Sequence, residues 1–159
     1  MLDISNEELR NAFELNFFSH YSFSTEAAKI LKDQNRGGQI LFNISKQAVN
    51  PGKNFGAYGL PKATTFFLMR QLALELGSDG IRVNGINADR IRSGLLTDEF
   101  ISSRAKSRGV SESEYMAGNL LNKEVTAEHV ADAFTALACA ESTTGPVSYT
   151  HLRAHETAQ

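Results

Sequence analysis

Residues 39–45 have the sequence Gln39-Ile-Leu-Phe-Asn-Ile-Ser45, which predicts a buried β-strand over Ile40–Ser45. Such a continuous apolar run is typical of a parallel sheet that is covered on both faces. A polar loop follows, and a helix is expected over residues 57–76, ending at Gly77. A second strand is expected over Ile81–Ile86. This strand–helix–strand unit, with its right-handed crossover, predicts an α/β fold.

Further helices are expected on both sides of this unit. Ser5 and Glu8 form the pattern of a capping box, which opens a helix that we extend to about Lys32. Two short helices are expected over residues 96–108 and 111–121, on either side of a flexible Gly109. The last predicted helix begins at Thr126 and runs to about residue 140.

Tyr58 and Lys62 are four residues apart, so their side chains share one face of the predicted helix. A phenol normally titrates near ~10, and a nearby ammonium favours its charged form. The pair therefore makes a tyrosinate accessible nearer neutral pH, which suits a general base that takes a proton from an alcohol. Ser45, at the end of its strand, is a candidate for holding a carbonyl oxygen. The alternatives are an ordinary surface pair and a serine that only caps a strand.

Four motifs in order resemble the C-terminal half of short-chain dehydrogenases/reductases, over about residues 5–145. They are the helix Phe13-Glu-Leu-Asn16, the strand Gly37-Gly-Gln-Ile-Leu-Phe-Asn-Ile-Ser45, the pair Tyr58 and Lys62, and Gly80-Ile-Arg-Val-Asn84. A lone tyrosine–lysine pattern is weak evidence, whereas four ordered elements are specific.

The resemblance implies a role for each matching residue. Tyr58 would transfer the proton, Lys62 would assist it and position a ribose, and Ser45 would hold the substrate oxygen. Asn16 would support a proton relay, although an asparagine facing solvent is the simpler alternative. The resemblance also implies an NAD-dependent oxidoreductase acting on a small alcohol or aldehyde.

Cofactor contacts are expected from Tyr58 and Lys62, and from Ile91 and Ser93 beside the nicotinamide carboxamide. The chain has no Gly-x-x-x-Gly-x-Gly turn for the pyrophosphate, so the choice between NAD and NADP stays open. We therefore expect a partial Rossmann-like, doubly wound parallel sheet. It would lack its N-terminal half and its last strand, and so keep two strands.

A narrower resemblance is to the dehydrogenase domain of bifunctional rhamnulose-1-phosphate aldolase/alcohol dehydrogenases. It is carried by residues 43–52 and 87–95, although Ala88-Asp89 stand where the family usually has Pro-Gly. This resemblance implies a hydroxyaldehyde such as lactaldehyde and an aldolase domain upstream. No metal site is expected in this chain, because zinc would belong to the aldolase domain.

The residues after Pro146 do not continue the family pattern. We therefore predict that residues 1–146 are the dehydrogenase half and that residues 147–159 are a non-native tail. His151 and His155 in that tail have the spacing of metal ligands, but the sequence around them lacks the further features of a zinc motif.

Composition narrows the class of protein. A formal net charge of −2 over 159 residues argues against nucleic-acid binding, and no apolar run approaches the ~18 residues of a membrane span. Cys139 is the only cysteine, which fits a reducing compartment and a cytoplasmic protein, and it is expected in the core.

A second hypothesis is a non-catalytic fragment that serves only as an association surface. The apolar run Phe66-Phe67-Leu68-Met69 gives its helix apolar character on more than one side. Two sides of that helix must therefore be buried against other parts of the protein or a partner. The resemblance to the short-chain dehydrogenases/reductases implies that the two long helices form the interface of a homo-oligomer. His20 and His129 are interpreted as ordinary helix residues.

Overall fold

The computed structural model describes residues 1–149 as an α/β fold whose three-stranded parallel sheet has the order β1-β2-β3. The strands are β1 (Gly38–Asn43), β2 (Ile81–Asn87) and β3 (Val147–Tyr149). The α-helices are α1 (Asn6–Phe13), α2 (Ser19–Gln34), α3 (Gly56–Leu76), α4 (Asp98–Ser107), α5 (Glu112–Met116) and α6 (Ala127–Cys139). Shorter turns are the π-helical η1 (Glu14–Phe18) and the 3-10 turns η2 (Lys46–Ala48) and η3 (Gly77–Asp79).

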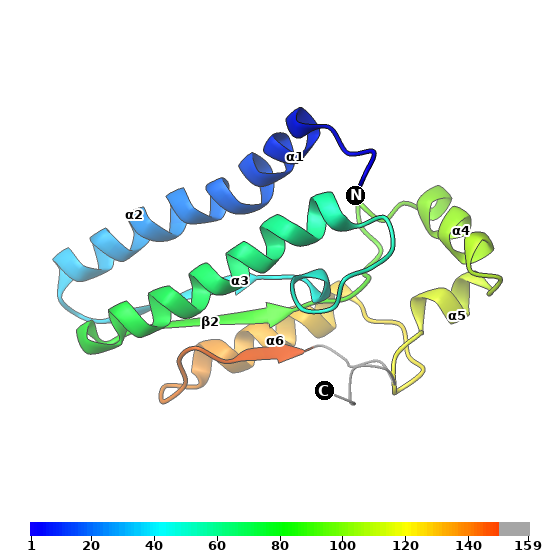
Figure 1. Ribbon diagram of the computed structural model, residues 1–159. Coiled ribbons are helices and arrows are strands. Elements are labelled where there is room, and N and C mark those ends of the chain that lie inside the picture. Colours follow the sequence, from blue (N-terminus) through cyan, green and yellow to red (C-terminus); the bar gives the residue numbers. More distant parts are fainter. Residues whose placement is uncertain (150–159) are drawn as a thin grey trace.

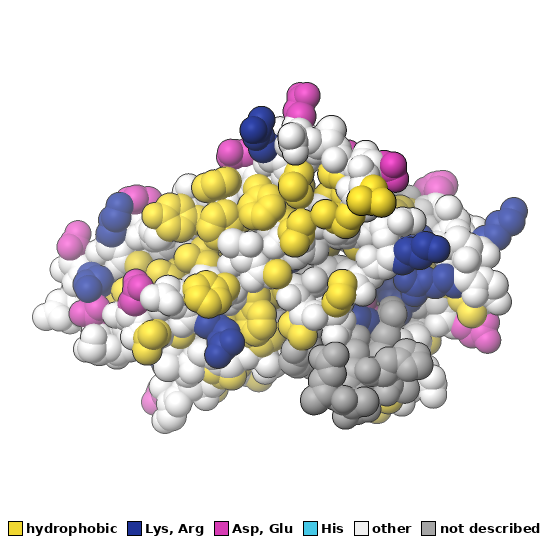
Figure 2. Space-filling view, viewed as in Figure 1, with side chains coloured by type: hydrophobic (Ala, Val, Ile, Leu, Met, Phe, Trp, Pro, Cys, Tyr) yellow, Lys and Arg dark blue, Asp and Glu magenta, His cyan; other side chains and the backbone are white. Residues whose placement is uncertain are grey.

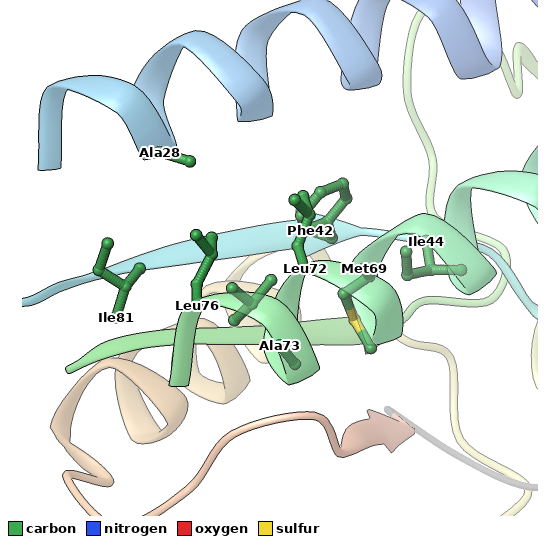
Figure 3. Packing of buried hydrophobic residues seen from close by; sticks show 9 residues of the cluster. Ala28, Phe42, Ile44, Met69, Leu72, Ala73, Leu76 and Ile81 are labelled. Atoms are coloured by element: carbon green, nitrogen blue, oxygen red, sulfur yellow. The ribbon is translucent and has the colours of Figure 1, made fainter. Parts of the chain in front are cut away.

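The sheet separates two apolar layers (Figure 1). Helices α2 and α3 cover one face, where Ala28, Phe42 and Met69 belong to one buried cluster (Figure 3). Helix α6 covers the other face, where Val130 and Leu137 pack with Ile86 of β2. Because successive residues of a strand face opposite sides, β2 supplies both layers. The predicted α/β fold and its strand–helix–strand unit are therefore confirmed.

Strand β3 corrects the expectation of two strands. Val147–Tyr149 pair in parallel with Gly85–Asn87 of β2. The chain reaches this edge through a turn at Gly145, whose φ is +86° and whose amide donates to the Val83 carbonyl at 2.8 Å. The expectation of two strands was based on the polar side chains of this segment, whereas the segment pairs through its backbone with the free edge of β2.

The first long helix was predicted to be continuous, but the structure divides it. Ser5 is its N-cap, accepting from the Glu8 amide at 3.1 Å, but η1 separates α1 from α2. A π-helical turn widens the helix, and such turns recur at functional sites.

Cys139 is exposed, which corrects its expected place in the core. The buried residues of α6 are Val130 and Leu137, two turns apart on one face. Cys139 lies about 200° around the helix from Leu137, and so faces away from the sheet.

Among the helices of residues 1–149, none combines the length and the apolar character that a membrane span requires. The predicted short helices before α6 form a separate layer. Helices α4 and α5 share a small core of Ile101, Ala105, Tyr115 and Met116 beyond the ends of β1 and β2 (Figure 1).

Candidate active site

The structure places Tyr58 and Lys62 on adjacent turns at the start of α3. The Lys62 ammonium lies 5.7 Å from the centroid of the Tyr58 ring. Tyr58 is half-buried, and Lys62 is 7% exposed. The predicted pair is therefore brought together, with the amine inside the protein and the phenol nearer the surface.

Burial affects the pKa of the lysine. Desolvation lowers the pKa of Lys62, because removal from water disfavours the ammonium. No carboxylate within residues 1–149 forms an ion pair with Lys62. The N–H groups of a buried amine that has no anionic partner can donate hydrogen bonds to neutral oxygen atoms.

Ser45 follows β1 and begins the turn η2. Its backbone is extended, and its hydroxyl oxygen accepts from the Gln47 amide at 3.2 Å, which caps η2. A hydroxyl that accepts in this way keeps its own proton for another acceptor.

Gly59 lets the serine turn approach the tyrosine helix closely. A Cβ on Gly59 would lie 3.3 Å from the Gln47 carbonyl oxygen. Turn η2 therefore packs against the first turn of α3, the turn that also carries Tyr58.

Asn16 lies inside η1, where the π-helical turn brings the first helix against α3. Its side-chain amide donates to the Ala12 carbonyl at 3.1 Å. Its backbone carbonyl accepts from the Thr65 hydroxyl at 2.6 Å. Thr65 is fully buried and one turn after Lys62, so this bond fastens Asn16 to the helix that carries the tyrosine–lysine pair.

The predicted cofactor residues Ile91 and Ser93 are on the loop after β2. Ile91 is half-buried and packs with the cluster around Ile86. Ser93 is exposed, and its hydroxyl accepts from the Leu95 and Leu96 amides at 3.3 Å each. Because β1 and β2 are parallel, this loop leaves the sheet at the same end as Ser45. No described contact joins either residue to Tyr58 or Lys62.

A buried charged cluster lies beside Ser45 and was not predicted from the sequence. The Asp89 carboxylate lies 3.8 Å from the Lys46 ammonium and 3.4 Å from the Arg90 guanidinium, and all three side chains are nearly buried. Arg90 also donates to the Tyr115 carbonyl and lies 4.3 Å from the centroid of that ring. The sequence signal was present, because Lys46 directly follows the serine and Asp89-Arg90 follow β2.

Within residues 1–149 no group of three metal-ligating side chains is close enough to hold an ion. The histidines at positions 151 and 155 lie outside the described residues, and so does most of the predicted tail.

Comparison with known proteins gives the family. A family model described as enoyl-(acyl carrier protein) reductase matches residues 1–150. The chain belongs to the short-chain dehydrogenase/reductase family. Relatives include the uncharacterized oxidoreductase YuxG of Bacillus subtilis, 36% identical over 134 residues, which are 79% of this chain and 19% of that protein. The 7alpha-hydroxysteroid dehydrogenase of Escherichia coli is 39% identical over 84 residues, 53% of this chain and 32% of that protein.

Solved structures of the family superpose on this chain. A short-chain type dehydrogenase/reductase from Mycobacterium ulcerans is 28% identical with a TM-score of 0.78, covering 92% of this chain and 52% of that one. A putative NAD(P)-dependent gluconate 5-dehydrogenase from Beutenbergia cavernae has a TM-score of 0.81 at 19% identity, covering 94% and 58%. The fold and the Rossmann-like class are therefore shown, and the chain spans about half the length of these structures.

Proposed function

We propose that the full-length protein is an oxidoreductase that uses a nicotinamide nucleotide to interconvert a small alcohol and its carbonyl compound. The observation that carries this proposal is the buried Lys62 amine beside the Tyr58 ring, on the helix turn against which the Ser45 turn packs. The nucleotide, when bound, supplies or accepts the hydride.

Each side chain has a role that its surroundings support. The Tyr58 hydroxyl is the group that gives the proton to a carbonyl oxygen or takes it from an alcohol. Lys62 stabilises negative charge on that oxygen, because its ammonium lies beside the ring in a poorly solvated place. Ser45 donates its free proton to the substrate oxygen, and Asn16 holds the inner end of a proton relay.

The residues present fit a nicotinamide nucleotide. The unpaired donors of Lys62 suit the hydroxyl groups of a ribose. Ile91 and Ser93 lie on the loop at the same end of the sheet, where the ligands of open α/β sheets bind. We propose NAD as the cofactor. The choice between the two nucleotides stays a proposal, since a related structure from Beutenbergia cavernae holds NADP and a 4-hydroxyisoleucine dehydrogenase structure holds NADH.

We propose lactaldehyde as the substrate and an aldolase domain upstream in the same protein. The match to YuxG supports the proposal that this chain belongs to a longer protein. The 134 matched residues are only 19% of YuxG, whereas the 84 residues matched in the hydroxysteroid dehydrogenase are 32% of that protein. YuxG therefore has much more sequence outside the dehydrogenase segment.

We also propose that residues 1–146 are the native dehydrogenase segment, that residues 147–159 are not, and that the protein is cytoplasmic. The single cysteine supports a reducing compartment. On its own the chain would be inactive, since the turn that holds the pyrophosphate would lie elsewhere in the full-length protein.

One observation favours a second candidate, an association module. Large apolar side chains are exposed on the helices α2 and α3, among them Phe23, Phe67 and Leu74. Figure 2 shows apolar side chains gathered over these helices. Such a surface fits a homo-oligomer built through the two long helices. This role is compatible with catalysis by the full-length protein.

The test is a pair of variants in the full-length protein, assayed with lactaldehyde and NADH and, in reverse, with propane-1,2-diol and NAD. We expect Tyr58→Phe to lose at least a hundredfold in kcat, because it removes the proton donor. Tyr21→Phe, on the exposed side of α2, is the matched control and should keep full activity. Equal activity of Tyr58→Phe and wild type would exclude the proposed chemistry, and an oligomer that neither binds NAD nor turns over would favour the association module.

A further inference from the structure

Asn87 is the last residue of β2, and it is 1% exposed. The amide nitrogen and the amide oxygen of its side chain are both buried, and neither has a hydrogen-bond partner among the residues that the structure describes. Buried side-chain amides are usually hydrogen-bonded, because an unpaired donor or acceptor has lost its water without compensation. Two unpaired atoms in one side chain therefore point to a ligand.

Asn87 lies beside Ser45 in the sheet. The backbone amides of the residues on either side of Ser45 donate to the carbonyls of the residues on either side of Asn87, at 2.9 and 3.3 Å. These two bonds hold Ser45 and Asn87 next to each other at the carboxyl end of two parallel strands. Ligands of open α/β sheets bind at this end.

The side chain of Asn87 faces α3. Successive residues of a strand alternate between the two faces of a sheet, so Asn87 is on the same face as Val83 and Gly85. Val83 belongs to the buried cluster that contains Met69 of α3, and a Cβ on Gly85 would lie 2.7 Å from the Met69 sulfur. Ile86 packs with α6 on the opposite face.

The position of Asn87 along α3 follows from the contact between Gly85 and Met69, because α3 and β2 run in opposite directions (Figure 1). Asn87 is two residues beyond Gly85, about 6.6 Å along the strand. Thr65 is four residues before Met69, about 6 Å back along the helix. Asn87 is therefore level with Thr65, whose hydroxyl already donates to the first helix, and close to the turn that carries Lys62.

The two unpaired atoms of Asn87 determine the chemistry of the ligand. One is a donor and the other an acceptor, so the ligand must present an acceptor and a donor side by side. A carboxylate or a phosphate would pair with the nitrogen and leave the oxygen facing negative charge, and an apolar group would pair with neither. A primary carboxamide pairs with both atoms at once through two hydrogen bonds in one plane. Exchanging the nitrogen and the oxygen of Asn87 leaves this conclusion unchanged.

We propose that Asn87 binds the carboxamide group of the nicotinamide, donating to its carbonyl oxygen and accepting from its N–H group. This inference rests on the proposed function. Asn87 adds a side chain from the strand itself to the loop residues Ile91 and Ser93, and two hydrogen bonds in one plane fix the rotation of the nicotinamide ring beside Ser45. The amide is covered in this structure, so binding also requires a shift of neighbouring chain. Residues 88–97, which follow directly and form no helix or strand, are placed to make it.

Calorimetric titration of the full-length protein with NAD tests this contact independently of turnover. Asn87→Leu removes the donor and the acceptor and keeps a side chain of similar length. We expect its Kd for NAD to rise roughly tenfold, as the loss of one or two hydrogen bonds implies. The second probe is 3-acetylpyridine adenine dinucleotide, in which a methyl group replaces the carboxamide nitrogen. The wild type should bind NAD more tightly than this analogue, and that preference should fall several-fold in Asn87→Leu.

The stability of the full-length protein without nucleotide is a further readout. Replacing both unpaired atoms of Asn87 by an apolar group removes an uncompensated cost, so Asn87→Leu should unfold at the same or a higher denaturant concentration than the wild type. Asn84→Leu is the matched control, because Asn84 is also buried in β2 but its amide donates to the Thr143 carbonyl at 2.8 Å. It should unfold at a lower concentration. A loss of stability in Asn87→Leu would show that its amide is paired inside the folded protein, for instance with a buried water, and would overturn the inference.

The outcomes distinguish this inference from the proposed function. If the wild type binds NAD and turns over, and Asn87→Leu binds NAD as tightly with the same preference over the analogue, the inference alone is overturned. A full-length wild type that binds no nicotinamide nucleotide would overturn both.

Discussion

Lys62 has an ammonium group that the fold keeps from water without supplying a carboxylate within residues 1–149. An arrangement of this kind costs stability, and it persists where the group has a use. We therefore expect Lys62→Met to abolish turnover in the full-length protein and to raise its free energy of unfolding. Chemical denaturation at pH 7 measures the free energy of unfolding. A value lower for Lys62→Met than for the wild type would contradict the prediction.

The difference in unfolding free energy between the wild type and Lys62→Met should change with pH in one direction. Burial lowers the pKa of Lys62 in the folded state, so the unfolded state binds more protons between that pKa and about 10.5. The stability of the wild type relative to Lys62→Met should therefore improve as the pH rises through this window. The gap between the two should be largest below the folded-state pKa of Lys62 and should narrow as the pH rises toward about 10.5.

Thr65 makes the bond that holds the π-helical turn against α3. Thr65→Val keeps the shape of the side chain and removes the hydroxyl, which leaves the Asn16 carbonyl without this donor. We expect a loss of about 1–2 kcal/mol in unfolding free energy, as is usual for a buried hydrogen bond. Thr64→Val is the control, because the Thr64 hydroxyl bonds only within its own helix, to the Leu60 carbonyl at 3.1 Å. Equal effects of the two substitutions would show that the contact between the helices contributes nothing.

The sequence predicts the contact partners of some residues and not of others. The spacing of Tyr58 and Lys62 within one helix is a local property, so their meeting was predictable. The partner of Asn16 was not, because Thr65 is 49 residues away from Asn16 along the chain. Only the packing of the first helix against α3 brings these two residues together.

At the scale of elements, two arginines fasten the small layer of α4 and α5 to the candidate site. Arg90, after β2, stacks on Tyr115 of α5, and Arg104 of α4 lies 4.6 Å from the ring centroid of Phe55, the N-cap of α3. A planar guanidinium stacks on a ring and donates sideways at the same time, which an ammonium cannot do. The layer is thereby tied both to the end of the sheet and to the helix of Tyr58.

We expect Arg90→Lys to loosen this layer. Amide exchange in α5 should become faster, and proteolysis near Gly109, between the two helices, should increase. Arg92→Lys is the control, because Arg92 is exposed and pairs with Asp98 and Glu124 at the surface. Unchanged exchange in α5 after Arg90→Lys would show that the apolar core of the layer holds it without the arginine.

Element boundaries were predictable where one local signal decides them. Gly77 ends α3, and Thr126 begins α6 by accepting from the His129 amide, both as the sequence indicated. Strand β3 and the π-helical turn were missed for different reasons. The strand depends on a free backbone edge of β2, and the turn depends on how the first helix fits against α3.

At the scale of the whole molecule, the long helices expose an apolar surface that is expected to be buried against another protein surface. Phe67 and Leu74 of α3 are 67% and 78% exposed, which is unusual for large apolar side chains on a helix that also packs on a sheet. Strand β1 pairs only with β2 among the described strands, so its other edge offers unpaired backbone groups. We expect the isolated 159-residue chain to be poorly soluble, and a monomeric product with a cooperative unfolding transition would contradict this.

The role of the helix surface can be tested in the full-length protein. We expect the double variant Phe67→Lys/Leu74→Lys to shift the full-length protein from oligomer to monomer, because two charges cannot be buried in an apolar interface without large cost. Leu121→Lys is the control, since Leu121 is equally exposed, at 76%, but lies after α5 and away from the long helices. Light scattering coupled to gel filtration measures the mass of each protein. If both variants remain oligomers of wild-type mass, the long helices are not the interface, and some other surface must hold the subunits together.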